Sequence, residues 1–342
     1  MAFGAHKASR ELWQAALQVA IKYEQYENVT MILSQLIALQ STVIVDKQKQ
    51  KQVYEKMLEE YQTEVDIERE VYRAYYLVAE KFSRSQAKNE EVGQLSQYYY
   101  DKFKPYLKIC KSTASINNIM VIGLWRYMAI NKYKEALDAC NDIIAYLKSR
   151  PFMYNARLNA ILSNKTICCI QLKKLEEGKE SIAEALSFAY EGTRGWFQNR
   201  VLYVRLCLHT QSYQEAWEVY KAIVEHTNLK SQPKPFLEEV KVIEALLFFL
   251  VEKKHIKPRL KDQKMIEKFS WFDFINDVPI YSRDHNGMQI PILLIQILWA
   301  VHSRNHKLIK PRLDTLNRFR TRISEIAADD GTLRSNYIIR MV

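Results

Sequence analysis

The stretch Lys132-Tyr133-Lys134-Glu135-Ala136-Leu137 recurs in altered form at residues 174–179 and 212–217. The second residue of each copy can serve as an anchor, and the anchors Tyr133, Leu175 and Tyr213 lie 42 and 38 residues apart. Three residues after the anchors stand the small residues Ala136, Gly178 and Ala216. Seven residues after the anchors stand Cys140, Ile182 and Tyr220, and ten residues after them stand Ile143, Ala185 and Ile223. Because the small third residue lets two helices approach closely and the later positions can pack on the next pair, this pattern predicts stacked antiparallel helix pairs.

This register resembles that of the tetratricopeptide repeat over residues 115–228. Looser matches cover residues 13–36 and 293–316. The spacing is longer than the 34 residues of that family, and its first-helix glycine is replaced by Leu124, Thr166 and Val204. The chain is also similar to uncharacterised tetratricopeptide-like proteins of Bacteroidetes type, at residues 135–140, 168–173, 278–284 and 333–337. The resemblance implies an α-solenoid and no enzymatic activity.

The rest of the chain is consistent with an all-α fold. Only 8 Gly and 8 Pro occur in 342 residues, apolar residues recur at steps of three and four, and no stretch alternates as a half-buried strand would. We therefore expect an α-solenoid of antiparallel helix hairpins. We divide it into an N-terminal helical region at 1–111 and tetratricopeptide-like repeats at 112–342, with one continuous solenoid as the alternative.

Residues 54–82 carry apolar or aromatic side chains at alternating steps of four and three, which could support a coiled-coil homodimer. Four tyrosines along this seam need partners for their hydroxyls, so packing against helices of the same chain is favoured. Residues 63–66 resemble a capping box, which leaves open whether the stretch is one helix or two.

Composition and targeting signals predict a cytoplasmic protein. The N-terminus has no apolar core of signal-peptide length, and the apolar runs at 245–251 and 290–301 are too short to cross a bilayer. Five cysteines without C-x-x-C spacing lie in helical apolar patterns, which indicates buried, reduced thiols. We expect no membrane partner.

The sequence carries no motif of an enzyme active site. It lacks a nucleophile elbow, a phosphate-binding loop, a dinucleotide-binding glycine pattern and a zinc-protease motif. His302 and His306 are four residues apart, but no Cys, Asp or Glu follows within the next several residues to complete a metal site. We therefore predict a protein without enzymatic activity, cofactor or metal, and the alternative is an active site assembled from scattered residues.

The first hypothesis for function is a scaffold that binds a protein or peptide in a concave groove, which stacked helix pairs characteristically form. The resemblance places the first helix of each pair along that groove. The residues it assigns there as partner-binding are Asn118, Trp125, Met128, Asn164, Gln198, Arg205 and His209.

The second hypothesis rests on charge. The net charge is +11, and residues 253–342 hold 17 Lys and Arg against 9 Asp and Glu. A basic face including Lys307, Lys310, Arg318 and Arg322 could bind nucleic acid or another polyanion, as in a transcriptional regulator. The alternative is a solvated helix face. The chain stops in what looks like the second turn of a helix begun at Asp330, which leaves open whether the natural chain continues past Val342.

Overall fold

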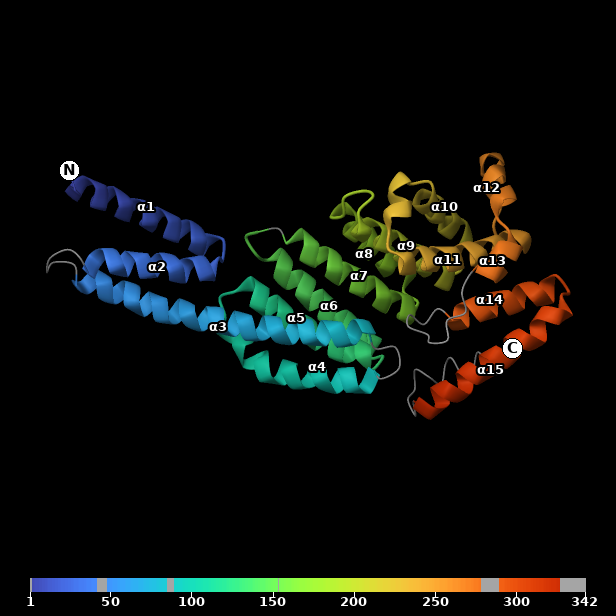
Figure 1. Ribbon diagram of the computed structural model, residues 1–342, viewed down its shortest axis with the longest axis horizontal. Coiled ribbons are helices and arrows are strands. Elements are labelled where there is room, and N and C mark those ends of the chain that lie inside the picture. Colours follow the sequence, from blue (N-terminus) through green and yellow to red (C-terminus); the bar gives the residue numbers. More distant parts are fainter. Residues whose placement is uncertain (1, 42–47, 85–88, 153, 278–288, 327–342) are drawn as a thin grey trace. The chain divides into compact units, whose positions relative to one another are not determined.

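A computed structural model shows a protein built from packed helices, which confirms the all-α prediction. It describes residues 2–41, 48–84, 89–152, 154–277 and 289–326, and no β-strand occurs in these ranges. The predicted helix at the chain end, from Asp330, lies outside them. The helices are α1 (Ala2–Lys22), α2 (Tyr26–Ser41), α3 (Gln48–Arg84), α4 (Asn89–Phe103), η1 (Lys104–Lys108), α5 (Thr113–Ala129), α6 (Tyr133–Lys148), α7 (Asn155–Leu172), α8 (Leu175–Ser187), α9 (Arg194–His209), α10 (Tyr213–Val224), η2 (Thr227–Ser231), α11 (Lys234–Glu252), η3 (Leu260–Asp262), α12 (Gln263–Lys268), α13 (Trp271–Asp277), α14 (Gln289–His302) and α15 (His306–Ile326), as labelled in Figure 1.

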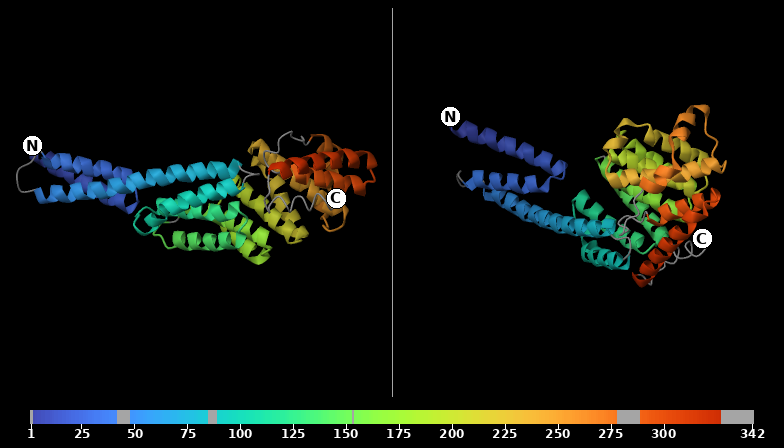
Figure 2. Two further views of the ribbon diagram at one scale, coloured as in Figure 1. Left: turned by 90° about the horizontal axis from the view of Figure 1, so that it is seen from below. Right: turned by 45° about the vertical axis from the view of Figure 1, so that its right-hand side comes forward.

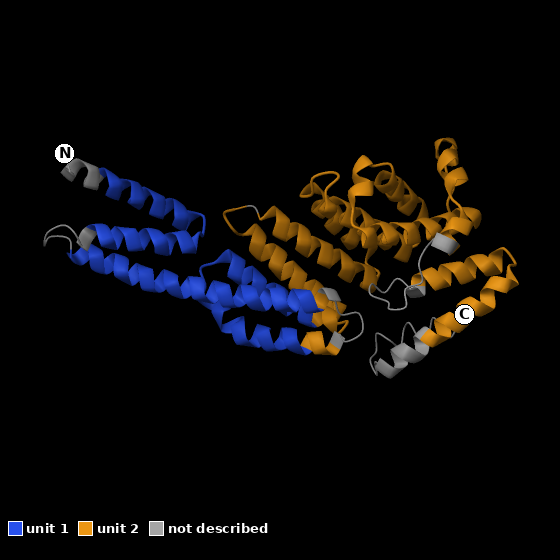
Figure 3. Cartoon of the chain, in the orientation of Figure 1, with its two compact units in different colours: residues 1–81, 94–126 blue, residues 82–93, 127–342 orange. Residues whose placement is uncertain are grey.

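The chain divides into two compact units, coloured separately in Figure 3. The first contains residues 1–81 and 94–126, and the second contains residues 82–93 and 127–342. The boundary predicted after residue 111, between an N-terminal helical region and the repeats, stays a prediction. Within the described ranges, none of the helices combines the length and the apolar character needed to cross a membrane.

In the first unit, α3 is a single helix of 37 residues, so the question of a break near residue 63 is settled in favour of one helix. Its N-terminal half packs on α1 and α2, which lie side by side in Figures 1 and 2. Its C-terminal half buries Val71 and Ala74 with Phe103 of α4 and Ile119 of α5. The N-terminal half of the predicted seam, at Tyr54, Tyr61 and Val65, therefore packs within its own chain, as predicted. In the C-terminal half the buried positions are Val71, Ala74 and Val78, while the seam residue Tyr72 is 52% exposed, so there the predicted register is wrong by one residue.

Three carboxylates meet at the start of α5. Glu24 accepts hydrogen bonds from the backbone N–H and the hydroxyl of Thr113, both at 2.7 Å. Glu64 accepts from the backbone N–H of Lys111 at 3.0 Å, and Glu68 accepts from the hydroxyl of Ser112 at 3.4 Å. Negative charge is favourable at a helix N-terminus, where backbone N–H groups lack partners, so these contacts hold α5 to α3 and to the turn after α1.

In the second unit, helices pack mainly on their neighbours in the sequence. Contacts join α6 to α7, α7 to α8, α8 to α9, α9 to α10 and α10 to α11. In Figures 1 and 2, where these helices run from green to yellow, each helix lies beside the one that follows it in the sequence. Other contacts skip over intervening helices: α7 packs on α9, and α11 packs on α13 and on α14. Further along, α14 packs on α15.

The same turn ends six helices. In each, one exposed or half-exposed residue adopts the left-handed conformation, with φ between 54° and 63°. The N–H of this residue bonds the carbonyl three residues earlier at 2.9–3.3 Å, and the next N–H bonds the carbonyl five residues earlier at 2.8–2.9 Å. These are the two bonds of a Schellman motif, and in five of the six turns a helix begins two residues after the left-handed position. The six residues are Glu24, Asn131, Lys173, Gln211, Lys254 and Arg304.

Burial confirms the register read from the sequence. The third, seventh and tenth residues after the anchors Tyr133, Leu175 and Tyr213 are all buried. At Gly178 the reason is close approach, since a Cβ atom there would lie 2.8 Å from Leu206 Cδ2 and 3.2 Å from Cys169 Cβ. A small residue at this position therefore lets α8 approach both α7 and α9.

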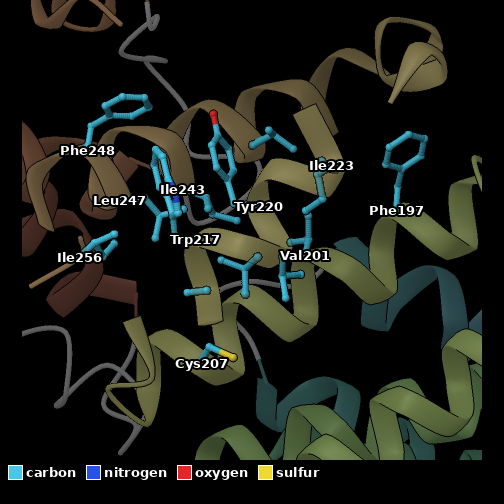
Figure 4. Close-up of a cluster of buried hydrophobic side chains, with 14 of the residues drawn as sticks. Phe197, Val201, Cys207, Trp217, Tyr220, Ile223, Ile243, Leu247, Phe248 and Ile256 are labelled. Atoms are coloured by element: carbon cyan, nitrogen blue, oxygen red, sulfur yellow. The ribbon is translucent and has the colours of Figure 1, made fainter. Parts of the chain in front are cut away.

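The largest fully buried side chains of the second unit, Trp217 and Tyr220, lie where α9, α10 and α11 meet, as Figure 4 shows. Trp217 and Tyr220 are completely buried, and Trp217 meets Phe248 edge to face with ring centroids 5.5 Å apart. Ile256, two residues after the turn at Lys254, closes this core, although no helix begins there. The chain instead continues into η3, α12 and α13.

Candidate functional site

Two of the residues predicted to line the groove, Asn118 and Trp125, lie in the first unit and are buried. The Trp125 ring packs on Tyr75 of α3, with centroids 5.0 Å apart. The Asn118 side chain accepts a hydrogen bond from Asn117 at 3.4 Å. Trp125 thus joins α5 to α3, while the hydrogen bond of Asn118 lies within α5.

The other five predicted groove residues lie in the second unit. Met128 is buried, Asn164 and Arg205 are half-buried, and Gln198 and His209 are exposed. Arg205 forms an ion pair with Glu239 of α11 at 2.6 Å. Three of the five are therefore on α9, and one of them links α9 to α11.

A buried polar network, which sequence reasoning missed, joins the facing sides of α7 and α9. Asn199 is almost completely buried; its amide donates to Asn159 at 3.1 Å, and its carbonyl oxygen accepts from the Ser163 hydroxyl at 2.8 Å. Buried polar groups need such partners, so these bonds fix how the two helices align. No local sequence signal marks the pairing, because Asn199 lies 40 residues after Asn159.

The predicted anion-binding residues lie on α15. Lys307, Lys310 and Arg318 are exposed, while the side chain of Arg322 lies outside the described part of the structure. Helical spacing places the exposed Asp314 on the same face as these cations. The basic face therefore carries an acid near its centre.

A hollow of about 480 Å³ opens in the second unit between α10, α11 and the segment from η3 to α13. Its walls combine four lysines with an apolar floor and three acids. The lining charged residues are Lys241, Lys261, Lys264, Lys268, Glu225, Glu244 and Asp273. The apolar and aromatic residues include Tyr220, Val224, Met265, Phe269 and Phe274.

One wall of this hollow holds a carboxyl and a phenol in direct contact. The Tyr220 hydroxyl donates to Glu244 at 2.6 Å. Burial raises the pKa of Glu244, although the hydrogen bond from Tyr220 and the charge of Lys241 work to lower it. Burial, together with the charge of Glu244, also raises the pKa of Tyr220 well above its ordinary value. The hydrogen bond between the two side chains anchors α10 to α11.

A buried ion pair positions the opposite wall. Lys221 of α10 reaches both carboxylate oxygens of Asp262, at 3.0 and 3.1 Å, and both side chains are at most 5% exposed. Asp262 also accepts from the Trp217 indole and from the Arg259 backbone, each at 3.0 Å. Burial works to raise the pKa of Asp262, but these hydrogen bonds and the charge of Lys221 outweigh it and lower that pKa. The 41 residues between the partners hid this clamp from sequence reasoning.

No group of three or more His, Cys, Asp and Glu side chains in the described ranges is arranged to hold a metal. His302 ends α14 and His306 begins α15. All five cysteines are free thiols, four of them buried and Cys110 half-buried. Comparison of the sequence with known protein families and with curated proteins finds no match.

Proposed function

We propose that this chain is a non-enzymatic, tetratricopeptide-like scaffold of stacked helix hairpins that binds a protein or peptide along the first helices of its repeats. The observation that carries the proposal is the repeated turn. From Asn131 onward, five copies follow one another at 42, 38, 43 and 50 residues. A chain that reverses in the same way at such intervals lays helices of similar length side by side.

The packing of the second unit supports this arrangement. Helices that contact mainly their sequence neighbours, with additional contacts between successive first helices such as α7 and α9, are what a stack of pairs requires. The polar bonds of Asn199 and the Arg205 ion pair link α7, α9 and α11 in series. By this reading α7, α9 and α11 form the inner layer.

The binding surface follows from the side chains that these helices leave accessible. On α9, Gln198, Leu202, Arg205 and His209 are separated by steps of four, three and four, so they form one stripe along the helix. On α7, a second stripe with the same steps contains Ala160, Asn164, Ile167 and Gln171. All eight are half-buried or exposed. Two parallel stripes that combine amides, a cation and short apolar groups suit an extended or helical peptide.

A peptide-display selection against the purified full chain tests this proposal. Peptides selected on the protein are measured by fluorescence polarisation against Gln198→Arg, which obstructs the α9 stripe, and Asn141→Arg, which makes the same change at an exposed position of α6. We expect Gln198→Arg to weaken binding at least tenfold and Asn141→Arg to leave it unchanged. Selection of no peptide, or equal effects of the two variants, would contradict the proposed surface.

A second candidate function is favoured by the exposure of Lys307, Lys310 and Arg318 on one side of α15, which suits contact with nucleic-acid phosphates. Such contacts release counterions and weaken steeply as salt rises. Titration of DNA and RNA at low and physiological salt tests it. The candidate predicts measurable, salt-sensitive affinity, and no affinity at low salt would remove it.

A further inference from the structure

We infer that the hollow between α10, α11 and α12 binds a small phosphate-bearing ligand whose remaining part has an apolar or aromatic face. The inference is independent of the peptide surface on α7 and α9. The volume of about 480 Å³ falls within the range of roughly 300–1,000 Å³ that is usual for small-molecule sites. All of its walls belong to the second unit.

Four lysines line the hollow from two sides. Lys261, Lys264 and Lys268 follow one another at steps of three and four, which puts them on one side of the η3–α12 segment, and Lys241 lines the hollow from α11. All four side chains belong to exposed residues. Like charges at this spacing repel one another, and a phosphate group bound in the hollow would relieve this repulsion. Lysine is a common phosphate binder, because its ammonium group is a compact charge with three donors.

The segment that carries the lysines is held in place by the residue before it, and not by burial of its own side chains. No residue of α12 is buried, yet the residue before it, Asp262, sits in the buried clamp with Lys221 and Trp217. Breaking a buried ion pair is costly, so the clamp holds the start of α12 against α10. With the start of this segment held, ligand binding would have to order mainly the lysine side chains.

The floor of the hollow indicates the rest of the ligand. Phe269 stacks on Phe248 with ring centroids 4.3 Å apart and an angle of 7° between the planes, and Met265 and Phe274 extend this apolar surface. The carboxylates of Glu225 and Asp273 add acceptors for hydroxyl or amino groups. A ligand that satisfies all three regions carries phosphate, an apolar or aromatic ring and hydrogen-bond donors. Nucleotides combine these features and serve as the probe.

The test is calorimetric titration of the full chain with ATP and with inorganic triphosphate, at low salt. The double variant Lys264→Gln, Lys268→Gln removes two charges from the hollow. The matched control, Lys230→Gln, Lys257→Gln, removes two exposed lysines outside it. We expect saturable binding of ATP that weakens at least tenfold in the first variant and less than twofold in the control.

Because the four substituted lysines are all exposed, both double variants should remain folded, which circular dichroism checks. Tighter binding of ATP than of inorganic triphosphate would support a role for the apolar floor. Equal affinities for ATP and inorganic triphosphate would support the phosphate site and overturn the inference that the ligand carries an apolar or aromatic ring. The whole inference is overturned if neither probe binds, or if the hollow variant and the control lose the same affinity.

Discussion

Replacing Lys221 with Met tests whether one buried ion pair holds the segment that begins at η3. The substitution keeps an unbranched side chain of similar length and removes the ammonium group. Asp262, which is 3% exposed, then keeps only the hydrogen bonds from the Trp217 indole and the Arg259 backbone. Its negative charge remains buried without a cation in contact. The Met side chain also loses the second ion pair of Lys221, with Glu218 at 2.9 Å.

The expected cost follows from this burial. Removing one partner of a buried pair costs about 3–5 kcal/mol, and the two remaining donors to Asp262 place this case near the lower end, about 3 kcal/mol. Lys179→Met is the matched control, because Lys179 pairs with Glu215 at 2.6 Å while the two side chains are 27% and 35% exposed. Pairs in contact with water contribute about 1 kcal/mol or less. The two ion pairs have similar lengths, so the difference in expected cost comes from their different burial.

The assay is urea unfolding at pH 7 followed by circular dichroism, with hydrogen exchange of residues 260–268 as a local readout. Lys221→Met should lower the free energy of unfolding of the second unit by about 3 kcal/mol and speed exchange in that segment. Lys179→Met should change both much less. If Lys179→Met costs as much as Lys221→Met, or if exchange at 260–268 is unaltered, the clamp does not hold the segment.

Three further predictions concern the repeat and its charges. Lys173→Gly should raise the free energy of unfolding by about 0.5–1 kcal/mol, because removing the steric strain of a side chain at positive φ outweighs the conformational entropy that glycine loses on folding. The control Lys174→Gly, at a negative φ, should lower it. The midpoints of urea unfolding measure both changes. Gly178→Leu should destabilise by about 3 kcal/mol, since the side chain meets Cys169 and Leu206, and an unchanged melting temperature would contradict the close approach. The pKa values of Glu215 and Asp262 are lowered, because hydrogen bonds and the charges of neighbouring lysines outweigh burial, which acts to raise them. Their stabilisation is therefore present above about pH 4 and lost as the pH falls through the folded values, and Asp262→Asn should flatten the acid limb of a stability-versus-pH curve.

The helical register could be read from the sequence because it depends on local periodicity. The small residue after each anchor, and the apolar residues that follow it, are repeated closely enough to align by eye, and Ala136, Gly178 and Ala216 are all buried. Helix ends were harder to predict. Of the six left-handed residues none is Gly and only Asn131 is of a type that favours this conformation, so the turns carry little sequence signal.

The sites depended on contacts between distant residues, which the sequence does not reveal. A repeat frame can place Trp125 on the first helix of a pair, but it cannot show that Tyr75, 50 residues earlier, packs on its ring. The lysines of α12 read as an ordinary charged helix until Asp262 and Lys221 are seen to hold the start of that helix against α10. The hollow is a product of three segments, and no single one of them predicts it.

Spin-label distances within the second unit measure most directly whether its helix pairs form a stack. Labels are attached one residue after the anchors Tyr133, Leu175 and Tyr213 and one residue after His306, the first residue of α15. The variants are Lys134→Cys, Glu176→Cys, Gln214→Cys and Lys307→Cys, with Cys110 replaced by Ser. A stack predicts that the distance from position 134 increases in order to positions 176, 214 and 307, because each turn adds another layer. A distance from 134 to 307 no longer than that from 134 to 176 would show a closed bundle and contradict the account.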